Sequence, residues 1–311
     1  MSAFHRMSRR GLLALAPLLA ARCAVAPDRA CDFVAPNAIP VAVTGGLPFV
    51  RMTVNGWPAT ALLDTGAERT LVAETLLAGI GLPVDPRRRA FQAGVTGNTE
   101  ARPVAYLPRV RLGTLELTGL GVGVVAPPGM LAPDGNPPQL VLGGDVLGQH
   151  DLDLDLPARR MTLYPARPCQ LDAAPFPGAT YALPMRVARN HIIAEVEANG
   201  RPAEAIMDTG ANLLHLSRSR ALSLGVTEAE LAAAPRRRVR GINNTQVEQA
   251  AIRLSTLRIG PELHRDVPAL VGQDGLAEFV IGTPWLLNRR LFVSYVNRRL
   301  LVRVPAGMPV V

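Results

Sequence analysis

Two aspartates of the 311-residue chain stand in closely similar surroundings. Asp64 lies in the sequence Leu-Leu-Asp-Thr-Gly-Ala at 62–67, and Asp208 lies in Ile-Met-Asp-Thr-Gly-Ala at 206–211. When two carboxyl groups are held close together, ionising both is unfavourable in free energy because the two negative charges repel each other. Such a pair therefore shares one proton. The ionised carboxylate can then act as a base on water, while the protonated carboxyl donates to a carbonyl oxygen.

The two motifs belong to an internal duplication of the chain. Residues 55–67 align without a gap with residues 199–211, and nine positions are identical. Three further landmarks follow in the same order in each half, which makes chance an untenable explanation. They are a Pro-Arg-Arg-Arg run before a glycine-containing turn (86–99 and 235–245), an apolar stretch with glycine (141–147 and 280–286) and a closing arginine pair (159–160 and 298–299).

Each half has the pattern of short strands joined by turns. Glycine and proline are plentiful, at 28 each, which favours a turn-rich β protein over a helical bundle. Asn-Gly pairs, the strongest two-residue hairpin signal, separate β-compatible runs in both halves. The alternation in Asp151–Leu156 predicts a half-buried strand. The remaining expectations are strands at 49–54, 59–63, 192–198 and 203–207, and short helices at 73–80, 217–224 and 227–234.

The paired motifs resemble the active-site motif of the retropepsin-like and pepsin-like aspartic peptidases. The alanine after the glycine is closer to the retroviral type, while two lobes in one chain are closer to pepsin. The resemblance covers about 38–305. It implies an all-β, bilobal acid-protease fold, in which two homologous β-barrel-like lobes with a few short helices are related by a pseudo-twofold axis. The implied parts are an N-terminal lobe at 38–165, a linker at 166–178 and a C-terminal lobe at 179–305.

The resemblance also implies roles for the motif residues. Asp64 and Asp208 would hydrolyse peptide bonds by activating water, without a metal or other cofactor. Thr65 and Thr209 would hold the two loops together by hydroxyl-to-backbone bonds. Gly66 and Gly210 would form the turns, where a larger residue would block the close backbone approach.

Two glycine- and asparagine-containing turns stand where flaps of this family would cover a substrate. Neither turn carries a tyrosine, so they are closer to the retroviral arrangement than to pepsin. The flap residues implied by the resemblance are Gly94, Val95, Thr96 and Gly97 in the first half, and Gly241, Ile242, Asn243 and Asn244 in the second.

These features predict an aspartic endopeptidase that acts on a peptide or protein substrate. One chain carries both motifs, so a monomer is sufficient. Two alternatives stay open: a non-catalytic peptide-binding protein on the same fold, and an enzyme that mainly processes itself. The proline-rich segment 127–138 has no counterpart in the second half, and it is either a surface loop or one wall of the cleft.

Composition argues against other classes of function. The formal net charge is +8, but the arginines are spread among acids and no basic and aromatic stripe of a nucleic-acid binder is present. The five histidines show no metal-ligand spacing, and we interpret them as structural or surface residues.

Residues 1–26 have the pattern of an export signal, which predicts a periplasmic or secreted protein. A basic region ends at Arg10, and the apolar stretch after it is too short for a permanent membrane span. Ser8–Leu13 resembles a twin-arginine signal, although an ordinary secretory signal is the alternative. Lipidation of Cys23 is disfavoured, because Arg22 stands where a lipobox requires a small residue.

Two cysteines, Cys31 and Cys169, remain after the expected signal. An even pair in an oxidising compartment suggests a disulfide that would pin the N-terminus to the middle of the chain. Two independent free thiols are the alternative.

Overall fold

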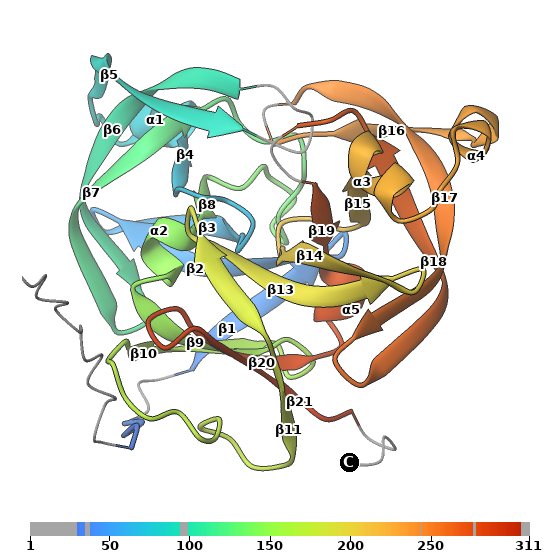
Figure 1. The fold of residues 1–311 in the computed structure, drawn as a ribbon. Helices are drawn as coiled ribbons and strands as arrows, with labels where there is room; N and C mark the ends of the chain where they lie inside the picture. Colours follow the sequence, from blue (N-terminus) through green and yellow to red (C-terminus); the bar gives the residue numbers. More distant parts are fainter. Residues whose placement is uncertain (1–29, 35–37, 94–98, 243, 276–277, 306–311) are drawn as a thin grey trace, which may run out of the picture.

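The computed structural model describes residues 30–34, 38–93, 99–242, 244–275 and 278–305, with the side chains of 91–93, 99 and 100 left aside. The expected export signal at 1–26, with Cys23, lies outside these residues. The chain forms two β-rich lobes that share one sheet, which confirms the predicted all-β, bilobal fold (Figure 1).

The first lobe is built mainly from strands, with two short helices. Its elements are β1 (Ile39–Thr44), β2 (Leu47–Val54), β3 (Trp57–Leu63), β4 (Leu71–Ala73), α1 (Glu74–Gly79), β5 (Val84–Ala93), β6 (Thr99–Leu112), β7 (Leu115–Val125), β8 (Leu140–Leu142), α2 (Gly144–Leu147), β9 (His150–Asp155) and β10 (Arg160–Pro165).

The second lobe repeats this order and adds one strand, β11, and one helix, α4. Its elements are β11 (Thr180–Leu183), β12 (Met185–Ala188), β13 (His191–Ala198), β14 (Arg201–Met207), β15 (Leu214–Ser217), α3 (Arg218–Ser223), α4 (Glu228–Ala233), β16 (Arg236–Arg240), β17 (Gln246–Ile259), β18 (Glu262–Gly272), β19 (Phe279–Ile281), α5 (Thr283–Leu286), β20 (Arg290–Ser294) and β21 (Arg299–Arg303).

The local predictions for turns and helices agree with the structure. Asn55 and Asn199 open the two hairpins with φ of 50° and 51°, and the glycines that follow have φ of 86° and 73°. This is the left-handed pair of conformations that a tight hairpin turn requires. The three expected short helices form as α1, α3 and α4, and α4 begins with a capping box at Thr227 and Glu230.

The two lobes share a sheet to which each half of the chain contributes. The strand order is β11-β21-β20-β9-β10-β1, and this sheet runs along the lower edge in Figure 1. Strands β9 and β20 pair antiparallel at its centre, from Arg290 opposite Asp155 to Ser294 opposite Asp151. We call these six strands the interlobe sheet.

The prediction that Asp151–Leu156 is half-buried is wrong. Asp151, Asp153 and Asp155 are all buried, because β9 lies at the centre of the interlobe sheet with both faces covered. Arg290 binds Asp153 through two hydrogen bonds of 3.0 and 2.7 Å, and it lies 3.4 Å from Asp155. The alternation therefore marks a row of buried acids, of which Asp153 and Asp155 are ion-paired, rather than a solvent face.

Cys31 and Cys169 are joined by a disulfide, with an S–S distance of 2.05 Å. Cys169 lies in the segment between β10 and β11, which was expected to be the linker. Leu171 and Phe176 of the same segment pack with Phe292 of β20 in one apolar cluster. The segment is therefore fixed to the interlobe sheet by a covalent bond and by burial of apolar side chains.

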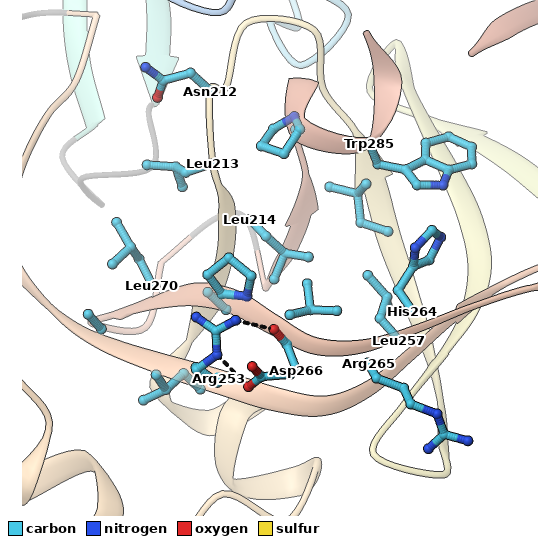
Figure 2. A pocket seen from close by; sticks show the side chains of 18 of the residues that line it. Asn212, Leu213, Leu214, Arg253, Leu257, His264, Arg265, Asp266, Leu270 and Trp285 are labelled. Carbon is cyan, nitrogen blue, oxygen red and sulfur yellow. Dashed lines mark hydrogen bonds and ion pairs between the residues drawn. The ribbon is translucent and has the colours of Figure 1, made fainter. Parts of the chain in front are cut away.

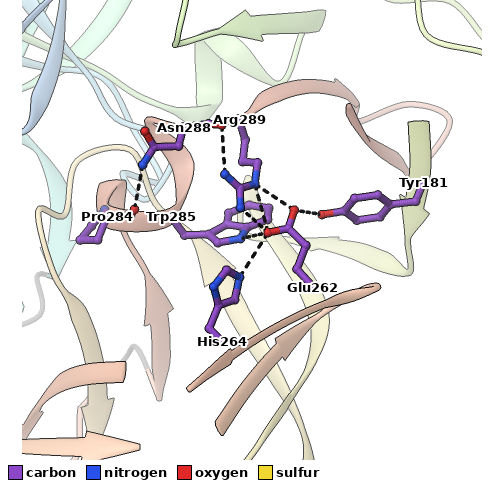
Figure 3. A network of polar contacts seen from close by, with 7 residues as sticks. All are labelled: Tyr181, Glu262, His264, Pro284, Trp285, Asn288 and Arg289. Carbon is purple, nitrogen blue, oxygen red and sulfur yellow. Dashed lines mark hydrogen bonds and ion pairs between the residues drawn. The ribbon is translucent and has the colours of Figure 1, made fainter. Parts of the chain in front are cut away.

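A buried carboxylate, Glu262, ties the interlobe sheet to the second lobe (Figure 3). Tyr181 of β11 donates a hydrogen bond of 2.7 Å to it, and the indole nitrogen of Trp285 donates one of 3.2 Å. Arg289 forms an ion pair with the same group, and His264 lies 3.2 Å away. Burial raises the pKa of Glu262, but these donors outweigh that effect and lower it to about 2.

This network predicts a loss of stability in acid. Because folding lowers the Glu262 pKa from 4.5 to about 2, its contribution to stability is complete above about pH 4.5 and disappears as the pH falls through about 2. We expect Glu262→Gln to be less stable at pH 7 but to lose less stability between pH 4.5 and 2 than the wild type. Melting temperatures at several pH values measure this, with the exposed Glu228→Gln as control; equal slopes would contradict the prediction.

Among the described residues, no helix is long and apolar enough to cross a membrane.

Candidate active site

The two Asp-Thr-Gly-Ala loops follow equivalent strands and are held by equivalent backbone bonds. β3 pairs parallel with β8, and β14 pairs parallel with β19. The N–H of Asp64 donates to Leu142 at 3.1 Å, and the N–H of Asp208 donates to Ile281 at 3.0 Å. The apolar-apolar-glycine elements of the duplication therefore lie directly behind the loops and hold the backbone N–H of each aspartate in place.

Thr65 and Thr209 lock the two loops together across the lobes. Each hydroxyl donates a hydrogen bond of 2.6 Å to a backbone carbonyl of the other lobe, Thr65 to Met207 and Thr209 to Leu63. Each hydroxyl also accepts from the other threonine's N–H, at 3.0 and 3.1 Å. Both threonines are buried, so the lobes share a closed set of four hydrogen bonds.

Removing one hydroxyl should leave two buried backbone groups without partners. We expect Thr65→Val to lower the free energy of unfolding by about 2–3 kcal/mol, because each unsatisfied buried group costs about 1–3 kcal/mol. Thr65→Ser keeps the hydroxyl and should stay within about 1 kcal/mol of the wild type. Urea unfolding measures both variants, and a Ser variant as unstable as the Val variant would assign the loss to packing.

Gly66 and Gly210 bring each loop into contact with the opposite aspartate. A Cβ atom at Gly66 would lie 2.1 Å from Cγ of Asp208, and one at Gly210 would lie 2.3 Å from Cγ of Asp64. No side chain fits at such distances, so only glycine permits this approach. The two carboxyl groups hydrogen-bond each other as a result.

The environment of the two carboxyl groups favours their neutral forms. Burial raises the pKa of Asp64, and the charge of Asp208 raises it further. Burial also raises the pKa of Asp208, against hydrogen bonds that favour the ionised form. The N–H groups of Gly66 and Gly210 donate to the carboxylates at 3.0 and 2.7 Å. Such a pair titrates as one unit and retains a shared proton over a range of pH.

A cleft of about 370 Å³ opens over the aspartates, within the size range of ligand sites. Both lobes supply its walls. Apolar side chains lie near the carboxyl groups, and arginines lie among the remaining lining residues. The apolar residues include Leu62, Leu71, Met130, Ile193, Ile206 and Ile242, and the arginines are Arg69, Arg102, Arg186, Arg189 and Arg240.

The structure places part of the second expected flap at this cleft. Gly241 and Ile242 line the cleft, and the N–H of Gly241 donates to Thr245 at 2.9 Å, which closes the turn. Asn244 donates from its side chain to the carbonyl of Pro127 at 2.8 Å. Asn243, and Gly94, Val95, Thr96 and Gly97 of the first flap, lie outside the described residues.

The segment between β7 and β8 contributes one residue, Met130, to the lining of the cleft. Met130 lines the cleft and packs on a buried apolar cluster that contains Ala132 and is also contacted by Ile242 of the second flap. Most of residues 127–138 form an exposed loop, and Met130 is the described residue of this segment that lines the cleft. Because the second half has no such insertion, the cleft is asymmetric about the two aspartates.

Sequence reasoning missed His191, which lines the cleft with both aspartates. His191 aligns with Leu47, since each begins the strand that precedes an Asn-Gly turn. The replacement of an apolar residue by histidine at this repeat position was the signal that could have indicated it. His215, by contrast, is buried and hydrogen-bonds Gln249 at 3.1 Å, as expected of a structural residue.

A larger cavity of about 930 Å³ lies in the second lobe against β18 and α5 (Figure 2). Its lining is mostly apolar, with Leu257 and Trp285 among the residues, and its one carboxylate, Asp266, is ion-paired with Arg253. This cavity has no pair of carboxyl groups like the one in the smaller cleft. Among the described residues, no cluster of histidine, cysteine and acidic side chains is arranged to hold a metal ion.

Comparison with known proteins agrees with this geometry. Residues 50–146 and 194–285 match a family model described as aspartyl protease. The matches cover more than half of the chain, one in each repeat, so the chain belongs to the aspartyl protease family as an internally duplicated member.

The chain is also similar to the crystal structure of a retropepsin-like aspartic protease from Rickettsia conorii. The sequence identity is 20% and the TM-score 0.33, over 41% of this chain and 95% of that chain. A comparison with curated proteins finds no match.

Proposed function

We propose that the protein is an aspartic endopeptidase whose catalytic residues are Asp64 and Asp208. The observation that carries this proposal is the mutual contact of the two loops, in which each glycine lies against the other lobe's carboxyl group. That contact creates a buried pair of carboxyl groups with raised pKa values at the base of a cleft. Such a pair supplies a general base and a general acid together.

In the proposed reaction, the ionised carboxylate takes a proton from water, and the water oxygen attacks the carbonyl carbon of the peptide. The protonated carboxyl donates its proton to the carbonyl oxygen. The carboxyl group that took the proton from water then gives it to the amide nitrogen, and the C–N bond breaks. The other carboxylate takes a proton from a hydroxyl group of the tetrahedral intermediate, which leaves the pair singly protonated. The N–H groups of Gly66 and Gly210 hold the two carboxyl groups in position through these steps.

The proposed substrate is an extended peptide that lies in the cleft between the lobes. Its backbone would bond to the flap segments as an added strand. Met130, Ile193 and Ile242 would receive apolar side chains on either side of the cut. One chain supplies both carboxyl groups, so the site needs no second copy.

We further propose that the protein works in the periplasm or outside the cell. The pattern of an export signal at 1–26 supports this location. The disulfide between Cys31 and Cys169 supports it as well, because such bonds persist in oxidising compartments. Fractionation of cells that express the full chain, followed by mass determination of the mature protein, would test both the location and the removal of the signal.

The direct test of function is incubation of the mature protein with a diverse peptide mixture between pH 3 and 8. Mass spectrometry maps the cuts, and the double variant Asp64→Asn with Asp208→Asn is the control. Cuts that appear with the wild type and are absent with the control support the proposal. Folded wild-type protein that binds peptides and leaves them intact at every pH would instead establish a peptide-binding protein.

A further inference from the structure

His191 lies at the active site in the position that Leu47 occupies in the first repeat. Leu47 is buried in an apolar cluster with Phe49. His191 is half-buried, lines the cleft with Asp64 and Asp208, and makes a hydrogen bond to the backbone of Gly66. The duplication therefore places one imidazole beside the two carboxyl groups, on one side only.

A tight turn of the second lobe holds this histidine against the first catalytic loop. Arg189 and Asn190 join β12 to β13 with φ of 51° and 64°. The side chain of Asn190 donates to the carbonyl of Glu68 at 3.0 Å, and Arg189 forms an ion pair of 2.7 Å with the Glu68 carboxylate. The imidazole of His191 and the turn before it thus make three contacts with residues 66–68.

The charges around the imidazole come from both lobes. Asp208 and Glu68 are the acids that favour its cationic form, and Arg189 in its own turn opposes it. Further arginines line the same cleft from several elements, at Arg69, Arg102, Arg186 and Arg240. Burial is the largest effect and lowers the pKa of His191, so the ring becomes cationic only in acid.

We propose that His191 is a positioning residue for the aspartate pair, whose imidazolium stabilises the singly ionised pair and extends peptide hydrolysis to lower pH. The proposal rests on the proposed function, because activity requires one proton on the pair. When His191 is protonated, its imidazolium lies near the Asp208 carboxylate. A neighbouring cation lowers the pKa of a carboxyl group.

The sign of the effect follows from the protonation states. On the acid side, activity is lost when the singly ionised pair takes up its second proton. A nearby cation opposes that uptake, so the loss occurs at lower pH. On the alkaline side His191 is neutral and has no such influence. Removing the imidazole should therefore move the acid limb of the pH profile and leave the alkaline limb in place.

The first experiment compares pH profiles of kcat/KM for wild type, His191→Leu and His191→Gln, with a peptide that the wild type cuts. The Leu variant copies the first repeat, and the Gln variant keeps a hydrogen-bond donor without charge. We expect the acid midpoint of both to rise by about one pH unit, with the alkaline midpoint unchanged. A merely structural role would lower activity at all pH values and would leave the acid midpoint in place, which overturns the proposal.

The second experiment needs no activity. An NMR titration of the imidazole of His191, assigned by its absence in His191→Gln, is carried out in wild type and in Asp208→Asn. Because binding linkage is reciprocal, the pKa of His191 should fall by about one unit when the Asp208 charge is removed. An unchanged pKa overturns the proposal, whereas a fall in a protein that cuts no peptide supports the coupling and rejects only the proposed function.

Discussion

Asp64→Asn and Asp208→Asn should each lower kcat by about 10³-fold or more, while the folded protein becomes more stable at neutral pH. The loss of activity follows because each variant removes the acid or the base of the pair, and general acid–base catalysis contributes about 10²–10⁴-fold. The two losses should not add in the double variant, because the carboxyl groups act as a unit.

The gain in stability follows from the raised pKa values. A carboxyl group whose pKa is raised by folding binds its proton more tightly in the folded state. Ionisation therefore costs stability once the pH rises above the unfolded value, and the cost grows until the folded pKa is passed. Asparagine does not titrate, so the variants avoid this cost.

Steady-state kinetics with one peptide, and melting temperatures at pH 4 and 7, measure the two effects. Asp172→Asn, at an exposed site between the lobes, is the matched control and should change neither quantity. A variant that loses activity together with stability would indicate a structural role for that aspartate.

Arg290→Met should lower the free energy of unfolding by about 3–5 kcal/mol. Arg290 is the partner of two buried acids, Asp153 and Asp155, and only 13% of its own side chain is exposed. Removing one partner of a buried ion pair leaves uncompensated charge in the interior, which is far more costly than the pair itself is favourable.

Urea unfolding measures this effect, with Arg111→Met as the control. Arg111 pairs with Glu116 at 3.1 Å, but both side chains are exposed, so its loss should cost less than about 1 kcal/mol. Changing Asp153 to Leu together with Arg290→Met should recover part of the lost stability. A cost for Arg290→Met as small as that of Arg111→Met would contradict a buried role.

Much of the fold could be predicted because its signals are local. The Asn-Gly turns and the helix starts depend on neighbouring residues, and the duplication predicts that each half folds alike. The burial of Asp151, Asp153 and Asp155 could not be predicted. The cation that compensates Asp153 belongs to the other half of the chain, and an alternating strand with distant partners looks identical to a solvent-facing one.

The candidate site also contains residues that could be predicted from the sequence and residues that could not. The positions of both aspartates, threonines and glycines follow from the repeated motif, and the structure brings them together. Met130 reaches the cleft from an insertion that the second repeat lacks, whereas His191 follows a turn of the same length as the one before Leu47. Both departures from the repeat, the insertion at 127–138 and the histidine in place of Leu47, were visible in the sequence. The sequence alone does not show which part of the site each of them lies beside.

The interlobe sheet determines when the chain can finish folding. β9 ends at Asp155, and its partner β20 begins only at Arg290, so a growing chain must be extended through almost all of the second lobe before the pair can form. At ribosomal rates this delay is about ten seconds, during which an acidic strand edge stays open. The N-terminal half therefore cannot complete the interlobe sheet by itself, and a chain released early would expose that edge to its neighbours.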